Sequence, residues 1–248
     1  MPVFTSEERD QVRSALVAAA RTSATISGAA HTGSAALGRE DRWSDIDLAL
    51  RLADDAAFDS VVAEWTNRMY REHDAVAHHD AWRGTTLYRV FLLANTLQVD
   101  LAFCLPSEFG ATGPSFRLIF GDANARAPAA AASTGDLIGM AWLYALHVRS
   151  SIARGRLWQA EYMLSGMRDS VLALACLRHH LPAHQGRGMD DLPPDVLLQL
   201  TPALARSLDV PELGRAFRAT TEALLREIAR VDGEMCKRVA DTMRALAG

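Results

Sequence analysis

Apolar residues in the first half of the chain recur with two different spacings. In residues 5–20 they follow the spacing of a helix, with Val12 and Leu16 on one side, so we predict an amphipathic helix there. Residues 45–50 alternate polar and apolar side chains, which is typical of a strand with one polar face. The same rules predict one more helix over 55–71 and three more strands over 25–30, 87–93 and 97–103. Turn-prone residues 94–96 join the last two strands, which we expect to form a hairpin.

The second half of the chain has helical spacing throughout. It follows a segment rich in Gly, Pro, Ala and Ser at residues 106–134, in which the Ala-rich stretch 127–132 suggests a crossing between domains. Beyond it, apolar residues recur every three or four positions over residues 136–153, 157–180 and 210–246. The sequence therefore predicts an α+β protein. An N-terminal domain, 1–125, would have a mixed β-sheet flanked by helices, and a C-terminal domain, 126–248, would be an all-helical bundle.

Composition narrows the class of protein. Of the 248 residues, 49% are hydrophobic and 23% are charged. No run of about 18 uncharged apolar residues occurs, so we expect no membrane-spanning segment. The N-terminus has acids where a signal peptide would have basic residues, so we expect a cytoplasmic protein. Cys104, Cys176 and Cys236 lie too far apart for a zinc motif, and we interpret them as reduced core residues.

Charge is distributed unevenly between the two halves. Residues 1–135 hold 17 acidic and 12 basic residues, whereas residues 136–248 hold 13 and 14. A nucleic-acid polymer needs basic surface to replace its counterions. A net-acidic first half therefore argues against such a polymer as substrate and favours a small or cationic acceptor.

The candidate chemistry lies between residues 33 and 47. Asp45 and Asp47 are two residues apart on a predicted strand, so both carboxylates project from one face. Such a pair can bind Mg²⁺ together with substrate phosphates. Gly33 permits close approach of the backbone to a phosphate, and Ser34 adds a hydroxyl at an expected helix N-terminus, where anions are favoured. We expect a triphosphate to bind at this turn, and we assign Ser44, directly before Asp45, to the same nucleotide site.

A third acid, Asp100, lies inside the apolar strand predicted at 97–103. A carboxylate there costs desolvation free energy unless it is paired or bound to a metal. If this strand neighbours that of Asp45 and Asp47, the three acids converge, and they repel one another unless a cation joins them. Metal ions held in this way position the attacking and leaving oxygens in nucleotidyl transfer. We therefore assign all three aspartates as catalytic metal ligands.

These residues resemble the signature of the DNA polymerase β-like nucleotidyltransferase superfamily. That signature is a hydrophobic residue followed by Gly-Gly or Gly-Ser, then two acids separated by one hydrophobic residue, then a separate third carboxylate. Thr32-Gly33-Ser34 and Asp45-Ile46-Asp47-Leu48 match its two halves, and Asp100 takes the third position. The resemblance directly covers residues 23–105.

A chain of this length with a helical C-terminal half is similar to the antibiotic nucleotidyltransferases that adenylylate aminoglycosides or lincosamides. This implies an enzyme that uses ATP and Mg²⁺ to modify a hydroxyl of a small molecule. Small antitoxin-type members of the superfamily often have Gly-Ser-x-Ala-Arg-Gly, whereas this chain has Leu37 in the arginine position. The antitoxin subgroup is therefore the weaker resemblance.

Three further residues are candidates for the same reaction. Arg39 and Arg42 could bind triphosphate oxygens through paired donors, or they could pair with Glu40 or with Asp41 in their own loop. Helical-domain residues supply the general base in some antibiotic nucleotidyltransferases, so the resemblance makes Glu161 a candidate base. Asp100 is its rival for that role. An ion pair between Glu161 and an arginine of the same domain is the structural alternative.

The sequence thus predicts a Mg²⁺-dependent enzyme that transfers a nucleoside monophosphate, expected to be AMP from ATP, to a small-molecule hydroxyl. An aminoglycoside or lincosamide would accept it, and pyrophosphate would be released. Two alternatives remain: transfer to a protein partner, as in an antitoxin or regulator, and a non-catalytic nucleotide-binding module. We expect no nucleic-acid polymer and no membrane as partner, and a homodimer that completes the site stays open.

Overall fold

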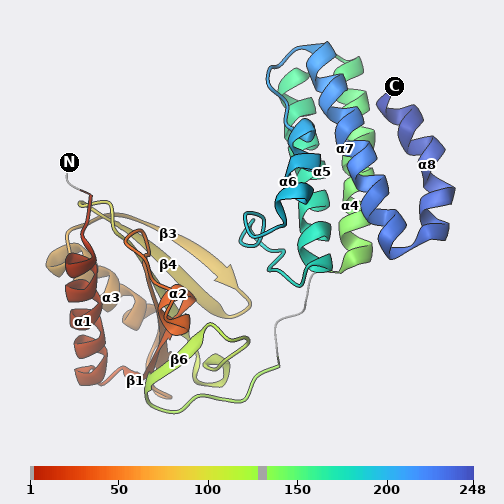
Figure 1. The fold of residues 1–248 in the computed structure, drawn as a ribbon. Coiled ribbons are helices and arrows are strands. Elements are labelled where there is room, and N and C mark those ends of the chain that lie inside the picture. The colour runs from red at the N-terminus through yellow and green to blue at the C-terminus, as the bar shows by residue number, and fades with distance from the viewer. Residues whose placement is uncertain (1–2, 128–132) are drawn as a thin grey trace. The chain divides into compact units, whose positions relative to one another are not determined.

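The computed structural model describes residues 3–127 and 133–248, and the chain divides into two compact units, Met1–Ala130 and Ala131–Gly248 (Figure 1). The first unit combines a β-sheet with helices and the second is helical, so the predicted α+β fold class is confirmed. Among the described helices, none has both the length and the hydropathy that a bilayer crossing requires.

The first unit is built around a six-stranded mixed sheet. Its elements are α1 (Ser6–Thr22), β1 (Ile26–Thr32), α2 (Gly33–Leu37), β2 (Ile46–Leu52), α3 (Phe58–Glu72), β3 (Ala75–Arg83), β4 (Thr86–Leu93), β5 (Gln98–Cys104), a short 3-10 helix (Pro106–Glu108) and β6 (Phe116–Phe120). The strand order is β3-β4-β5-β2-β1-β6. β2 and β5 are parallel and all other neighbours are antiparallel, which includes the predicted β4–β5 hairpin.

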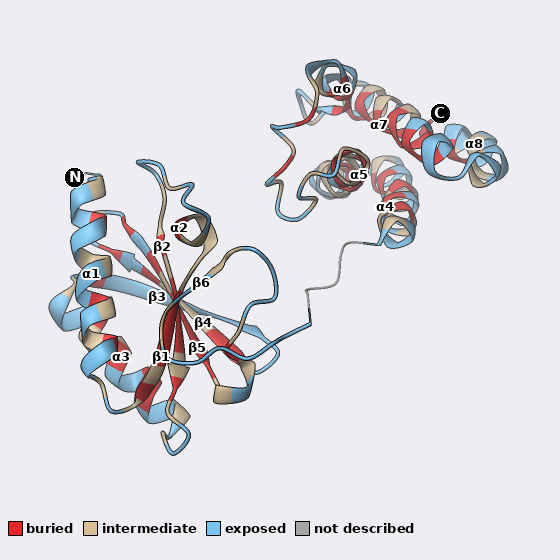
Figure 2. Cartoon of the chain, turned by 60° about the horizontal axis from the view of Figure 1, so that its bottom comes forward, coloured by how far each residue is buried: buried red, intermediate tan, exposed pale blue. Residues whose placement is uncertain are grey.

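The two faces of this sheet are covered differently (Figure 2). Helices α1 and α3 cover one face, where Leu16 and Trp65 pack against strand residues such as Leu48. On the opposite face Ala49 belongs to a smaller cluster that also includes Phe109. Since successive side chains of a strand point to opposite faces, β2 turns Leu48 toward the helices and Asp47 away from them.

Two strands depart from the sequence expectation. β3 is an edge strand in which every residue after Ala75 is exposed, so it has no alternation of polar and apolar residues to predict it. β6 lies within the Gly-, Pro-, Ala- and Ser-rich segment 106–134, for which we predicted no strand, and it pairs with β1. Of the Ala-rich stretch 127–132 that suggested the crossing, residues 128–132 lie outside the described residues.

The second unit consists of helices with a core of its own. Its elements are α4 (Thr134–Ala153), α5 (Leu157–Arg178), α6 (Pro194–Leu200), a 3-10 helix (Thr201–Ala203), α7 (Val210–Val231) and α8 (Gly233–Ala247). Leu164 of α5 and Phe217 of α7 are among its fully buried side chains. The helical pattern over 210–246 forms two helices, because Asp232 leaves the helical conformation and its side chain accepts the N–H of Met235 as the cap of α8.

Candidate metal and phosphate site

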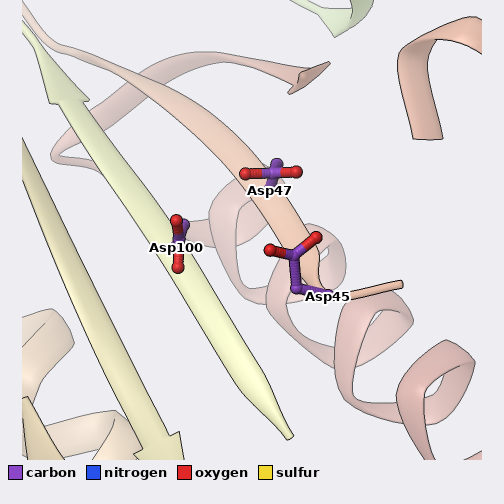
Figure 3. A group of neighbouring side chains, drawn as sticks. All are labelled: Asp45, Asp47 and Asp100. Atoms are coloured by element: carbon purple, nitrogen blue, oxygen red, sulfur yellow. The ribbon is translucent and has the colours of Figure 1, made fainter. Parts of the chain in front are cut away.

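Three aspartates converge at the start of β2 and β5. These strands are parallel neighbours, and Asp47 and Asp100 are register partners, so both side chains leave the sheet on the same face. Asp45 lies just before β2 and points toward the other two (Figure 3). One oxygen from each carboxylate lies within 4.8 Å of the others. The convergence that the sequence analysis made conditional on strand order is thus present.

Close spacing and partial burial make this cluster electrostatically costly. The amide of Gln98 donates to Asp100 at 2.9 Å and to Asp45 at 3.3 Å, bridging two of the three acids. Burial, which is the largest cause, and the charge of Asp45 together raise the pKa of Asp100 to about 6, against the opposing effect of the Gln98 hydrogen bond. A cation placed among the carboxylates would reverse this cost, because an opposite charge favours the ionised form.

The donor set of the cluster fits a hard divalent cation. All three side chains offer carboxylate oxygens, which Mg²⁺ and Ca²⁺ bind in proteins, and Mg²⁺ characteristically retains positions for water and substrate phosphates. Neither histidine nor cysteine belongs to this cluster, so the softer ligands that favour zinc are missing from it. Asp45, Asp47 and Asp100 are therefore the residues that would hold a divalent metal ion.

The backbone at Gly33, where β1 ends and α2 begins, lies in direct contact with this cluster. Its φ of 59° lies in the left-handed region, which costs little only for glycine. A β-carbon at this position would lie 2.0 Å from Oδ2 of Asp47. Both backbone conformation and space therefore require glycine, and the first residue of α2 lies against a metal-ligand candidate. Ser34 follows it in the first turn of that helix, as predicted.

The loop between α2 and β2 is held by an arginine that the sequence analysis did not single out. Arg9 of α1 is only 5% exposed. Its guanidinium donates to the carbonyl of Asp41 at 2.5 Å and to that of Ser44 at 3.4 Å, and it lies 3.7 Å from the carboxylate of Glu40. Because Ser44 directly precedes Asp45, Arg9 fixes the segment that delivers the first aspartate.

Some side chains of this loop interact with one another. The hydroxyl of Ser44 accepts the N–H of Asp41 at 2.9 Å and donates to its carboxylate at 3.1 Å. Arg42 is exposed and stacks 4.2 Å above the ring of Trp43, and Arg39 is exposed as well. The assignment of Arg39, Arg42 and Ser44 to nucleotide binding stays a prediction.

The charge partners expected for the loop arginines are engaged elsewhere. Glu40 forms its ion pairs with Arg9 and Arg13 of α1. The carboxylate of Asp41 accepts the backbone N–H of Trp43 at 2.8 Å, and these local hydrogen bonds lower its pKa. Within the described residues, neither acid forms an ion pair with Arg39 or Arg42. Both arginines therefore keep their donors for another partner.

Glu161 belongs to α5 in the second unit. Its carboxylate accepts a hydrogen bond from the hydroxyl of Ser165 at 2.6 Å, and Arg168 donates to the same hydroxyl at 3.0 Å. In the described part of the chain Glu161 forms no ion pair with an arginine, so the structural alternative raised for it is not observed. Its role as general base stays a prediction.

No protein-family model and no curated protein sequence matches the chain. Among solved structures, an aminoglycoside 6-adenyltransferase from Bacillus subtilis aligns with a TM-score of 0.42 and 10% sequence identity, over 96% of this chain and 98% of that one. Similarity at this level does not assign a function.

Proposed function

We propose that the chain is a Mg²⁺-dependent nucleotidyltransferase that transfers a nucleoside monophosphate to a small-molecule hydroxyl. The observation that carries the proposal is the contact between Gly33 and Asp47 within the three-aspartate cluster. A turn suited to phosphate and a set of divalent-metal ligands meet there. Binding Mg²⁺ and nucleotide phosphates at one point is what nucleotidyl transfer requires.

Each residue has a defined part in the proposed reaction. Asp45, Asp47 and Asp100 hold Mg²⁺, which neutralises phosphate charge when bound, and Gly33 and Ser34 contact the β- and γ-phosphates. The acceptor oxygen attacks the α-phosphorus, the bond from that phosphorus to the bridging β-phosphate oxygen breaks, and pyrophosphate leaves. Asp100 or Glu161 takes the proton of the acceptor hydroxyl.

We assign a different role in the proposed reaction to each of the two units. The first, with the metal and phosphate residues, would be the nucleotidyltransferase domain, and the helical second unit would bind the acceptor. Trp158 and Tyr162 support that assignment, since they are 78% and 69% exposed on the same helix as Glu161. Exposed aromatic side chains of this kind can pack on an acceptor ring. We propose ATP as nucleotide and an aminoglycoside or a lincosamide as acceptor.

The test is a pyrophosphate-release screen of ATP and GTP against a panel of aminoglycosides and lincosamides. We expect release with at least one acceptor, and an Asp47→Asn variant should be about a thousandfold slower because it removes a metal ligand. Asp55→Asn is the matched control, because Asp55 is an exposed aspartate of the same unit and lies outside the cluster. Label from ATP marked at the α-phosphate, if found on a protein, would favour the protein-directed alternative. An active and folded Asp47→Asn variant would refute the proposal.

A further inference from the structure

A pocket of the first unit lies on the face of the sheet that α1 covers, opposite the aspartate cluster. Its volume is about 310 Å³, and it is lined by Arg13, Ser14, Val17, Ala18 and Arg21 of α1 and His31 of β1. His31 is the register partner of Leu48, so its side chain is on the helix-covered face. Asp47 points to the opposite face. The pocket is therefore separate from the candidate metal site.

Positive charge predominates around this pocket. Arg13 and Arg21 line it. Arg117 of β6, the neighbouring strand of β1 at the sheet edge, is a register partner of His31. Arg13 forms ion pairs with the carboxylates of Asp10 and Glu40. The surroundings of the pocket therefore contain three guanidinium groups and two carboxylates.

Arg21 stacks 4.8 Å from the ring centroid of Phe120 and donates one hydrogen bond, at 3.2 Å, to the carbonyl of Ile119. A guanidinium has five N–H donors. Most donors of Arg21 therefore remain available to a ligand.

His31 supplies an unsatisfied polar atom at the same place. Its Nδ1 is buried and has no hydrogen-bond partner among the described residues. A buried polar atom without a hydrogen bond is energetically unfavourable. Rotation of the imidazole about its Cβ–Cγ bond would let this nitrogen donate a hydrogen bond to an oxyanion in the pocket, where the oxyanion would also contact the arginines. Arginine is well suited to phosphate, because its planar fork donates paired hydrogen bonds.

We propose that this pocket binds the phosphate group of a small phosphorylated metabolite through Arg13, Arg21 and His31. Its volume is at the lower end of the range of about 300–1,000 Å³ that is typical of ligand pockets, which favours a small ligand. The site is independent of the proposed nucleotidyl transfer, so either proposal can fail without the other.

The test follows the imidazole NMR signals of the full-length protein in EDTA at constant ionic strength. The chain has eight histidines, and a His31→Asn variant identifies the signal of His31. The probes are inorganic phosphate, glucose 6-phosphate and, as an uncharged control, glucose. We expect a saturable shift of the His31 signal with both phosphates and none with glucose. Tighter binding of glucose 6-phosphate than of inorganic phosphate would identify a phosphorylated metabolite as the ligand class, whereas tighter binding of inorganic phosphate would overturn that part of the proposal.

Two variants and one control decide whether the pocket is responsible. Arg21→Gln should weaken phosphate binding about tenfold, because it removes a charged donor. Arg117→Gln should weaken it as well, and this exposed position provides the test if Arg21→Gln does not fold. Arg71→Gln, on the exposed surface of α3, should have no effect. No saturable shift of the His31 signal, or a shift that Arg21→Gln and Arg117→Gln leave unchanged, would overturn the proposal.

Discussion

Both units hold carboxylates away from bulk water, but they balance the charge in different ways. In the second unit Glu227 of α7 is 5% exposed. It accepts two hydrogen bonds from Arg178, at 2.9 and 3.1 Å, and one from Arg230 at 2.5 Å. In the first unit three aspartates lie together, and the neutral amide of Gln98 donates hydrogen bonds to Asp45 and Asp100. Two arginines of the fold therefore neutralise Glu227, whereas Asp45 and Asp100 share a neutral donor and repel each other, and a bound divalent cation would offset that repulsion.

This difference separates a structural charge from a functional one. Removing a carboxylate that arginines neutralise leaves those arginines without a partner, so the folded state loses stability. Removing one carboxylate from a group of like charges relieves repulsion and desolvation, so the metal-free folded state gains stability. Substitutions in the two units should therefore change the free energy of unfolding with opposite signs.

Glu227 should give the largest change. Truncating one partner of a buried ion pair costs about 3–5 kcal/mol, so we expect Glu227→Ala to lower the free energy of unfolding by an amount in that range. Glu222→Ala is the matched control on the same helix, because Glu222 pairs with Arg244 at the exposed surface. Such pairs contribute about 0–1 kcal/mol. Chemical denaturation followed by circular dichroism measures both, and equal effects would show that burial of Glu227 has no energetic consequence.

Asp100 should give a smaller change of opposite sign. Its folded-state pKa is about 6, above its ordinary 3.8, so the stability that comes from the protonated form is lost as the pH rises through about 6. With about 1.4 kcal/mol per pKa unit, the ionised form costs up to about 3 kcal/mol. We therefore expect Asp100→Asn to be the more stable protein at pH 8 in EDTA, with the difference shrinking toward pH 4.

Added Mg²⁺ should then favour the parent. Ligands that bind only the folded state raise its stability, and Asp100→Asn removes one of the three carboxylates that would hold the ion. Unfolding curves at pH 8 with EDTA and with Mg²⁺ measure both effects. A variant that is less stable than the parent without metal would contradict the view that these acids repel one another in the folded protein.

The metal cluster could be predicted because its signals are local in the sequence. Asp45 and Asp47 lie two positions apart at the start of β2, where residues 45–48 alternate polar and apolar, and Asp100 interrupts an otherwise apolar strand. Their convergence depended on one tertiary fact, the parallel pairing of β2 and β5, which spacing alone does not determine. Strand β3 escaped prediction because both of its faces are exposed.

The role of Arg9 could not be predicted for a related reason. Its partners are the backbone carbonyls of Asp41 and Ser44, more than 30 positions away along the chain. Every residue has such a carbonyl, so the residue types at these positions do not indicate the hydrogen bonds. An arginine on an amphipathic helix is typical of a solvated surface. Only its burial in the structure distinguishes it from the other arginines of that helix.

Arg9 should give the smallest effect in this comparison. It is a buried charge of the first unit, and it holds the loop that precedes Asp45 of the aspartate cluster. Arg9→Lys keeps the charge, but a single ammonium group does not reproduce the forked donors that reach two carbonyls. We expect the loop before Asp45 to be less well fixed, so that kcat falls and the KM for Mg²⁺ rises, each by about tenfold or less. Arg13→Lys is the matched control, because Arg13 contacts Glu40 but neither of these carbonyls. Equal losses of kcat in both variants would show that Arg9 has a structural role only, like Glu227. The same would follow if the loss of kcat in Arg9→Lys came with a lower unfolding temperature and an unchanged KM for Mg²⁺.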